Sequence, residues 1–139
     1  MDEDNKILKV DYDFTTNEKK AIEFLTQRLE ILHKKYIIRI SSINHIILIH
    51  KKHYSFKIYL NKEFDKKNIV ILQLLLNSDY KKEIETIRNI VHKRANWNIL
   101  FDFKVYADGN IIVAQKKDIT KKVLDQIKSS LEKEKFKKK

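Results

Sequence analysis

The stretch YSFKIYL, residues 54–60, determines the expected fold class, because its side chains alternate in character at every second position. The apolar positions are Tyr54, Phe56, Ile58 and Leu60, and the intervening ones are Ser55, Lys57, Tyr59 and Asn61. A strand with this period has one apolar face and one face that is polar but aromatic. Residues 51–53 predict a turn from a preceding strand at about 43–50, and Ser41 and Ser42 indicate a bulge or break before that strand.

The N-terminal part of the chain predicts a strand followed by an amphipathic helix. Residues 7–14 alternate between apolar and polar side chains, which favours the strand. Thr15 and Glu18 have the spacing of a capping box, in which each side chain satisfies a backbone amide at the start of a helix. Apolar residues at spacings of three and four predict the helix over residues 16–35. They are Ile22, Leu25, Leu29, Leu32 and Tyr36.

Residues 69–76 (IVILQLLL) leave two structures open, because a buried strand and the first half of a long helix have the same apolar composition. We favour a strand. After Asn77 and Ser78, which are both able to cap a helix, the spacing of apolar residues predicts a helix that ends near Ala95. Its stripe consists of Tyr80, Ile84, Ile87 and Val91.

The dipeptide Asp108-Gly109 lies between two alternating segments, and it predicts a hairpin with a two-residue type I′ turn. The return strand is expected at residues 110–116. The expected cross-strand pairs are Tyr106 with Ile111, Lys104 with Val113 and Asp102 with Gln115. The other face, expected in the core, carries Phe101, Phe103, Val105, Ile112 and Ala114.

Asp118 is positioned to cap a final helix. The apolar stripe of this helix is Ile119, Val123, Ile127 and Leu131. The stripe has two possible uses, since it can pack on the chain's own sheet or form the seam of a homodimer, and its length leaves both open.

Together these elements predict one α+β domain over residues 1–139: an antiparallel sheet built from two hairpin regions and covered by three amphipathic helices. Residues 1–6 are expected to be an acidic flexible arm, and residues 132–139 a Lys-rich tail that frays. The longest apolar run is too short to cross a bilayer, and the first residues lack the basic region of a signal peptide. We therefore expect an intracellular protein with no membrane partner.

The composition excludes several classes of site. The chain has no Cys, which excludes disulfides, Cys-ligated metals and thiol nucleophiles. It has one Gly, which excludes the glycine-rich phosphate loops of nucleotide-binding enzymes. The histidines at 45, 50 and 53 have no carboxylate near them in the sequence, so we predict no metal and no cofactor.

The charge points instead to a polyanion, because 30 Lys and Arg against 19 Asp and Glu give a net charge of +11. Single-stranded nucleic acid is bound by cations that contact phosphates and by rings on which bases stack. If helices cover one side of the sheet, the other side would display Lys57, Tyr59, Lys104 and Tyr106. The full set of predicted nucleic-acid-binding residues is Arg39, Lys57, Tyr59, Arg94, Trp97, Lys104, Tyr106 and Lys116.

We thus predict a non-enzymatic, sequence-independent nucleic-acid-binding protein that prefers single strands, with DNA and RNA both open. One alternative is an assembly or inhibitor protein whose basic surface docks an acidic protein partner. The other is a nuclease: Asp102-Phe103-Lys104 resembles the acid-x-Lys half of the motif of metal-dependent nucleases of the PD-(D/E)xK type. That motif needs a further acid on a nearby strand, and the acids upstream, such as Glu83 and Glu85, lie on an expected helix.

Overall fold

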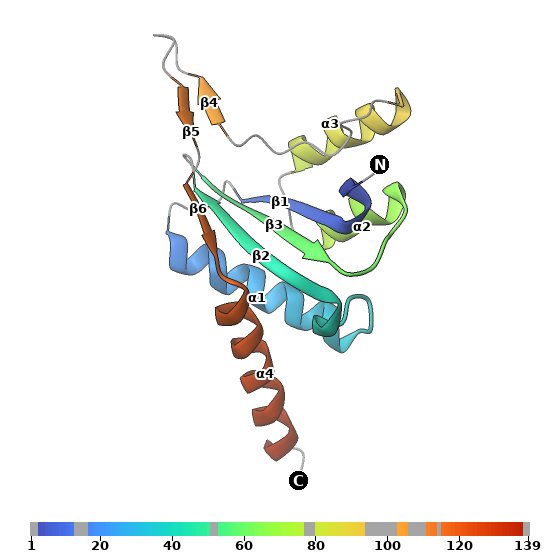
Figure 1. Ribbon diagram of the computed structural model, residues 1–139. Coiled ribbons are helices and arrows are strands. Elements are labelled where there is room, and N and C mark those ends of the chain that lie inside the picture. The colour runs from blue at the N-terminus through green and yellow to red at the C-terminus, as the bar shows by residue number, and fades with distance from the viewer. Residues whose placement is uncertain are drawn as a thin grey trace.

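The computed structural model describes residues 3–12, 17–50, 53–76, 80–93, 103–105, 111–113 and 115–137. The elements are, in chain order, η1 (Glu3–Lys6), β1 (Ile7–Tyr12), α1 (Glu18–Lys34), η2 (Ile40–Ser42), β2 (Ile43–His50), β3 (Tyr54–Leu60), α2 (Lys66–Leu75), α3 (Tyr80–Val91), β4 (Phe103–Val105), β5 (Ile111–Val113), β6 (Gln115–Asp118) and α4 (Thr120–Lys137). The predicted α+β class is confirmed, because helices cover an antiparallel sheet (Figure 1). Within the residues described, no helix is both long and apolar enough to cross a membrane.

The main sheet has four strands in the order β1-β3-β2-β6, and every pairing in it is antiparallel. Two of the helices, α1 and α4, pack against each other on one side of this sheet, while α2 lies against β1 with α3 beyond it (Figure 1). The first predicted hairpin is therefore the centre of the fold. The short strands β4 and β5 pair with each other in a separate two-stranded sheet, which differs from the single sheet expected.

The alternation in β3 sets the register on both of its sides. Phe56 lies opposite Val10 of β1 and Leu48 of β2, so all three side chains point to the same face. A shift of register between Ile43 and His45 marks a bulge in β2. Because the bulge adds one residue, Ile43 before it and Ile46 and Leu48 after it all lie on the core face.

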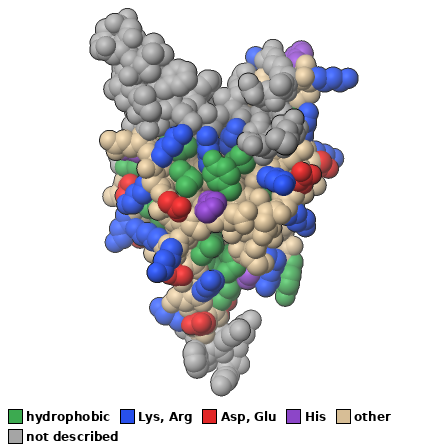
Figure 2. Space-filling model, in the orientation of Figure 1, with side chains coloured by type: hydrophobic (Ala, Val, Ile, Leu, Met, Phe, Trp, Pro, Cys, Tyr) green, Lys and Arg blue, Asp and Glu red, His purple; other side chains and the backbone are tan. Residues whose placement is uncertain are grey.

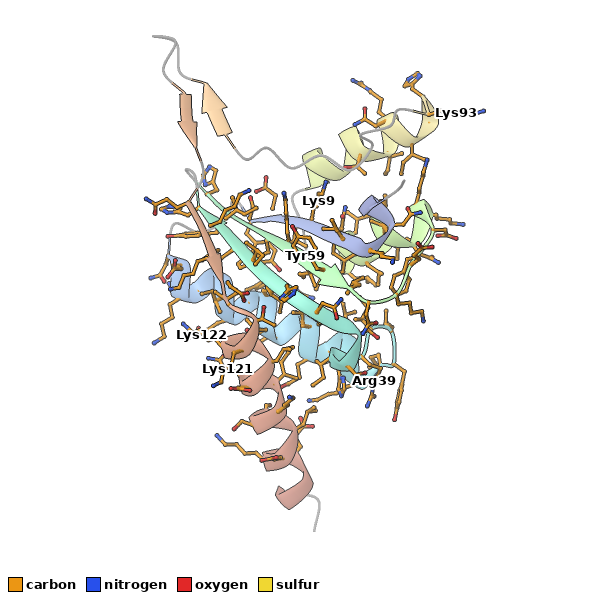
Figure 3. The ribbon with its side chains drawn as sticks, viewed as in Figure 1. Lys9, Arg39, Tyr59, Lys93, Lys121 and Lys122 are labelled. Carbon is orange, nitrogen blue, oxygen red and sulfur yellow. The ribbon has the colours of Figure 1, made fainter. Side chains whose placement is uncertain are left out.

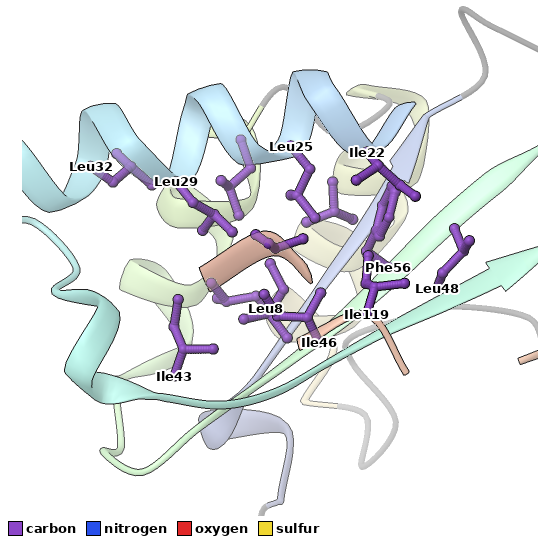
Figure 4. Close-up of a cluster of buried hydrophobic side chains, with 14 of the residues drawn as sticks. Leu8, Ile22, Leu25, Leu29, Leu32, Ile43, Ile46, Leu48, Phe56 and Ile119 are labelled. Carbon is purple, nitrogen blue, oxygen red and sulfur yellow. The ribbon is translucent and has the colours of Figure 1, made fainter. Parts of the chain in front are cut away.

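The core lies between this sheet face and the helices (Figure 4). The four predicted stripe residues of α1 that are buried in it are Ile22, Leu25, Leu29 and Leu32. Strand residues that meet them include Leu8, Ile43, Ile46, Leu48 and Phe56. The predicted strand faces and the helix stripe are thus confirmed, apart from the last member of the stripe, Tyr36.

The two ends of α1 differ from the sequence prediction. Asn17 caps the helix, since its Oδ1 accepts a hydrogen bond from the Lys20 amide at 3.1 Å, and Thr15 lies outside the described residues. At the other end Tyr36 is 80% exposed, because the helix has already ended at Lys34 and the backbone of Tyr36 is left-handed with φ 60°. The expectation that Tyr36 joins the buried stripe is wrong.

The segment 69–76 is not a strand, because residues 66–75 form α2. Asp65 begins this helix by accepting a hydrogen bond from the Asn68 amide at 2.8 Å, and this cap was not recognised in the sequence. The helix covers the edge of β1, where Gln73 Oε1 accepts a hydrogen bond from the Lys9 amide at 2.9 Å. A polar residue in the apolar run thus satisfies an amide that an edge strand would leave unpaired.

The apolar stripe predicted for α3 is not buried where its side chains are described. Ile87 and Val91 are exposed, whereas Thr86 and Asn89 are buried. The reason is that α3 packs on α2 and not on the sheet, through the face that carries Thr86, Asn89 and the partly buried Ile90. The helix also ends earlier than expected, at Val91.

The second hairpin has a different register from the one predicted. Lys104 pairs with Ile112, not with Val113, and Val105 pairs with Ile111. A two-residue turn needs an even number of residues between partners, whereas five residues separate Val105 from Ile111. Ile112 therefore shares a face with Lys104 and not with Phe103. The remaining expected positions, Phe101, Asp102, Tyr106 and Ala114, lie outside the described residues.

The predicted return strand is divided, because β6 leaves the hairpin and pairs with β2 of the main sheet. Asp118 then caps α4 as expected, its Oδ1 accepting a hydrogen bond from the Thr120 amide at 2.9 Å. The stripe residues Ile119, Val123 and Ile127 are buried in the chain's own core, so they are not available as a dimer seam. The helix α4 includes residues 132–137 of the predicted C-terminal tail. In the predicted N-terminal arm, the Asn5 carbonyl in η1 accepts a hydrogen bond from the Phe64 amide.

Tyr12 connects β1 to the end of α2, and its loss should weaken the fold. Its hydroxyl donates to the Leu76 carbonyl at 2.7 Å, and burial raises the pKa of Tyr12 above its ordinary range. We expect Tyr12→Phe to lower the free energy of unfolding by about 1–2 kcal/mol, because a buried carbonyl loses its donor. Urea unfolding measures this. The control Tyr59→Phe should change the value by less than about 0.5 kcal/mol, and an equal loss in both variants would refute the role of the bond.

His33, at the end of α1, should make stability depend on pH. Burial and the charge of Arg39 lower the pKa of His33, and its Nδ1 accepts a hydrogen bond from the Ile40 amide at 3.0 Å. The unfolded chain therefore takes up the proton first, and stability should fall as the pH drops below about 6.5. Urea midpoints at about pH 7.5 and about pH 5.5 test this.

The variant His33→Asn is the matched control, because an amide oxygen accepts the same hydrogen bond and does not titrate. The drop in urea midpoint between the two pH values should be smaller in this variant. If the drop is unchanged, other groups cause it.

Candidate nucleic-acid interface

The face of the sheet opposite the core is built from three rows of residues that lie across the strands. The first row is Ile7, Tyr59 and His45. The second is Lys9, Lys57, Ile47 and Asp118. The third is Asp11, Ser55, Ile49 and Lys116. Residues directly opposite each other in antiparallel strands share a face, so each row forms a line of neighbouring side chains.

Only part of this face is accessible. Ser55 and Ile49 in the third row are buried, while most of the first two rows is half-buried or exposed. We call the accessible part the Tyr59 face. It consists of Ile7, Lys9, His45, Ile47, Lys57, Tyr59, Asp118 and, at its margin, Lys116. Figure 3 shows Tyr59 near the middle of the sheet with Lys9 beyond it, and in Figure 2 cationic side chains surround a patch of hydrophobic ones and a histidine.

Tyr59 is the aromatic centre of this face. Its ring is half-buried, and the His45 ring meets it edge-on with 6.5 Å between the centroids. The bulge in β2 places His45 there, since it shifts the register so that His45 pairs with Tyr59. Lys57 and Lys9 follow in the next row, so cations lie directly beside the ring. This combination of ring and cations is the one that single-stranded nucleic acid requires.

The two carboxylates among these rows both hold hydrogen bonds within the protein. Asp11 accepts from the Ser55 hydroxyl, and Asp118 accepts from the amide and the hydroxyl of Thr120. The hydrogen bonds from Thr120 lower the pKa of Asp118, because they stabilise its charged form. These carboxylates have structural roles at the margin of the Tyr59 face, and lysines outnumber them there.

A shallow depression of about 830 Å³ continues from the Tyr59 face along the start of α4. It is lined by Asn44, His45, Lys117, Asp118, Ile119, Thr120, Lys121, Lys122 and Asp125. Lys121 and Lys122 both lie on α4 beside the sheet (Figure 3). The Lys117 Nζ is 3.9 Å from a Glu18 carboxylate oxygen, so its charge is partly compensated. The cationic surface thus extends beyond the sheet edge.

The structure brings together three of the predicted binding residues, Lys57, Tyr59 and Lys116. Lys104 is not on this sheet, because β4 pairs only with β5 among the described strands, and the expected continuous surface with Lys104 is therefore wrong. Arg39 lies at the end of α1, where its Nη1 donates to the His33 carbonyl at 3.2 Å. Three further predicted residues, Arg94, Trp97 and Tyr106, lie outside the described part of the chain.

The histidines do not form a metal site in the part of the chain that the structure describes, where no group of three potential ligands occurs. His45 and His50 lie on opposite faces of β2, and His50 instead stacks on the Tyr54 ring at 4.7 Å. Asp102 of the nuclease-like half motif is not among the described residues, so that hypothesis is untested.

The cationic or titratable residues of this surface that were missed in the sequence include Lys9, His45, Lys121 and Lys122. The alternation of residues 7–14 already places Lys9 on the polar side of its strand, so the pairing of β1 with β3 would have revealed it. His45 depends on the bulge, and the two α4 lysines depend on where β6 joins the sheet. Ser41 and Ser42 indicate a bulge or break near the start of β2 but do not fix its register, and the position at which β6 joins the sheet has no local sequence signal.

Comparison with known proteins finds no matching family, no similar curated protein and no similar solved structure.

Proposed function

We propose that this protein binds single-stranded nucleic acid through the Tyr59 face, without sequence preference and without catalysis. The observation that carries the proposal is Tyr59 on the sheet face opposite the core, with Lys57 and Lys9 in the adjacent row. The net charge of +11 supports it, since a cationic body attracts polyanions from a distance.

The preference for single strands follows from the ring. Bases of a single strand can leave their neighbours and stack on an aromatic side chain, and every base offers a flat face for this contact. Bases of a duplex are already stacked, so a ring on a sheet surface does not reach them. Cations in the next row would contact phosphates, which are the same for every sequence. Both contacts are therefore indifferent to sequence.

The depression along α4 would lengthen the binding surface. Lys121 and Lys122 continue the cationic path from His45 past the sheet edge. A homodimer is not needed for this proposal, because one chain supplies both ring and cations. An α4 seam would also require the buried Val123 and Ile127 to leave the core.

Loss of the Tyr59 ring should weaken binding. We expect Tyr59→Ala to reduce the affinity for a fluorescein-labelled oligothymidine by about 1–3 kcal/mol, because one stacked base loses its platform. Fluorescence polarisation measures this. Tyr59→Phe keeps the ring and should bind like the wild type. Equal affinities for the Ala variant and the wild type would disprove stacking at this position. Incubation of the same mixtures with Mg²⁺ should leave the oligonucleotide intact, and cleavage would contradict the absence of catalysis.

The lysines of the Tyr59 face should determine the salt dependence. In the variant Lys9→Ala with Lys57→Ala, the slope of log affinity against log salt concentration should become shallower by about 0.7 per lost phosphate contact. The matched control is Lys67→Ala with Lys128→Ala, which removes the same charge from exposed positions on α2 and α4. If both double variants change the slope equally, binding is a property of net charge and not of this face.

A second candidate function, the docking of an acidic protein partner, is favoured by a different surface. Exposed aliphatic residues gather on α2 and α3: Ile71, Leu74, Leu75, Ile87 and Val91. Exposed cations, among them Lys67 and Lys93, occupy the same two segments. Apolar residues beside cations fit an acidic amphipathic helix. The variant Ile87→Ser with Val91→Ser distinguishes the two functions, since it should leave oligonucleotide binding unchanged.

A further inference from the structure

The end of α1 carries an aromatic residue where glycine is the usual choice. The Tyr36 amide donates to the His33 carbonyl at 3.1 Å, and the Ile37 amide donates to the Leu32 carbonyl at 3.0 Å. This pair of hydrogen bonds closes the helix around a left-handed residue, here Tyr36 with φ 60°. A residue with a Cβ is disfavoured in that conformation, and glycine is not. Tyr36 therefore carries a local backbone cost that glycine would not have.

Packing of the Tyr36 ring in the core does not offset this backbone cost, because the residue is 80% exposed. Its one described ring contact is with Arg39, whose Cζ lies 4.6 Å from the ring centroid. Arg39 is itself held in place, because its Nη1 donates to the His33 carbonyl. The ring and the guanidinium thus form an exposed pair whose position is set by the end of a helix.

We propose that Tyr36 and Arg39 form a second base-stacking platform, which binds an unpaired nucleobase of the same strand that the Tyr59 face binds. The inference rests on the proposed function and adds a separate site to it. The guanidinium occupies one side of the ring by a cation–π contact. The exposure of Tyr36 leaves area on which a base can stack, and the guanidinium donors that His33 does not use would contact a phosphate of the bound strand.

Hydrogen bonds connect the segment that carries Arg39 to the backbone that follows Tyr59. The backbone after Tyr59 leads to Asn61, whose amide donates to the Ser42 carbonyl at 2.9 Å and whose Nδ2 donates to the Ser41 carbonyl at 3.0 Å. Ser42 in turn donates to the Arg39 carbonyl. These bonds connect the Arg39 segment to the backbone that follows β3, and Figure 3 shows Arg39 beyond the sheet, near the end of α1. The proposed strand would run from Tyr59 past this end of the sheet to the Tyr36–Arg39 pair.

The decisive variant is Tyr36→Gly, because it separates binding from folding. Glycine suits the left-handed position, so the melting temperature should equal or exceed that of the wild type. The ring is nevertheless lost, and the affinity for labelled oligothymidine should fall by about 5-fold to 150-fold. Tyr36→Phe retains the ring and should bind within about 2-fold of the wild type.

An abasic oligonucleotide of the same length is the second probe, because it has the same phosphates and no bases. Tyr36→Gly should not change the affinity for this probe, whereas Arg39→Ala should weaken the binding of both probes. If Tyr36→Gly binds oligothymidine like the wild type while Tyr59→Ala does not, the platform is disproved and the proposed function stands. If the wild type binds neither oligothymidine nor oligouridine, both proposals are overturned.

Discussion

The strict alternation of β3 is the constraint on which the rest of the molecule depends. This strand is paired on both sides, with β1 and with β2, so its register decides which side chains of three strands enter the core. A shift by one residue would move Phe56 and Ile58 to the surface and bring Lys57 and Tyr59 under α1. The same alternation that builds the core therefore also assembles the Tyr59 face. The core and the candidate interface are the two opposite faces of the same strand.

The helices complete the domain by different means. α1 and α4 bury apolar stripes against the sheet, and Lys34 joins them through ion pairs with Glu30 and Glu134. α2 also supplies polar groups, since Gln73 and the Leu76 carbonyl bond to the backbone of Lys9 and the hydroxyl of Tyr12. The bond from the Lys9 amide to Gln73 occupies a backbone donor on the open edge of β1, which would otherwise be available to another chain. α3 packs on α2 and leaves Ile87 and Val91 exposed.

The surface chemistry is a mixture that suits a polyanion with flat groups. In the proposed function lysines would supply charge, and Tyr59 and the Tyr36–Arg39 pair would supply stacking area, while the carboxylates near Tyr59 are engaged in hydrogen bonds inside the protein. None of these features needs a cofactor or a reactive side chain. Affinity would come from many weak contacts, each of which is largely independent of base identity.

The sequence by itself determined the α+β class, the core faces of β1 and β3 and the apolar stripes of α1 and α4, because hydrophobic periodicity is a local property. It also located Lys57 and Tyr59 on a common polar face. Only the tertiary structure decided that residues 66–75 are helical, that β6 leaves its hairpin for β2, and that Lys9, His45 and Lys116 join Tyr59. Those outcomes depend on contacts between segments that are far apart in the sequence. The local pattern of one segment does not specify which distant segment packs against it.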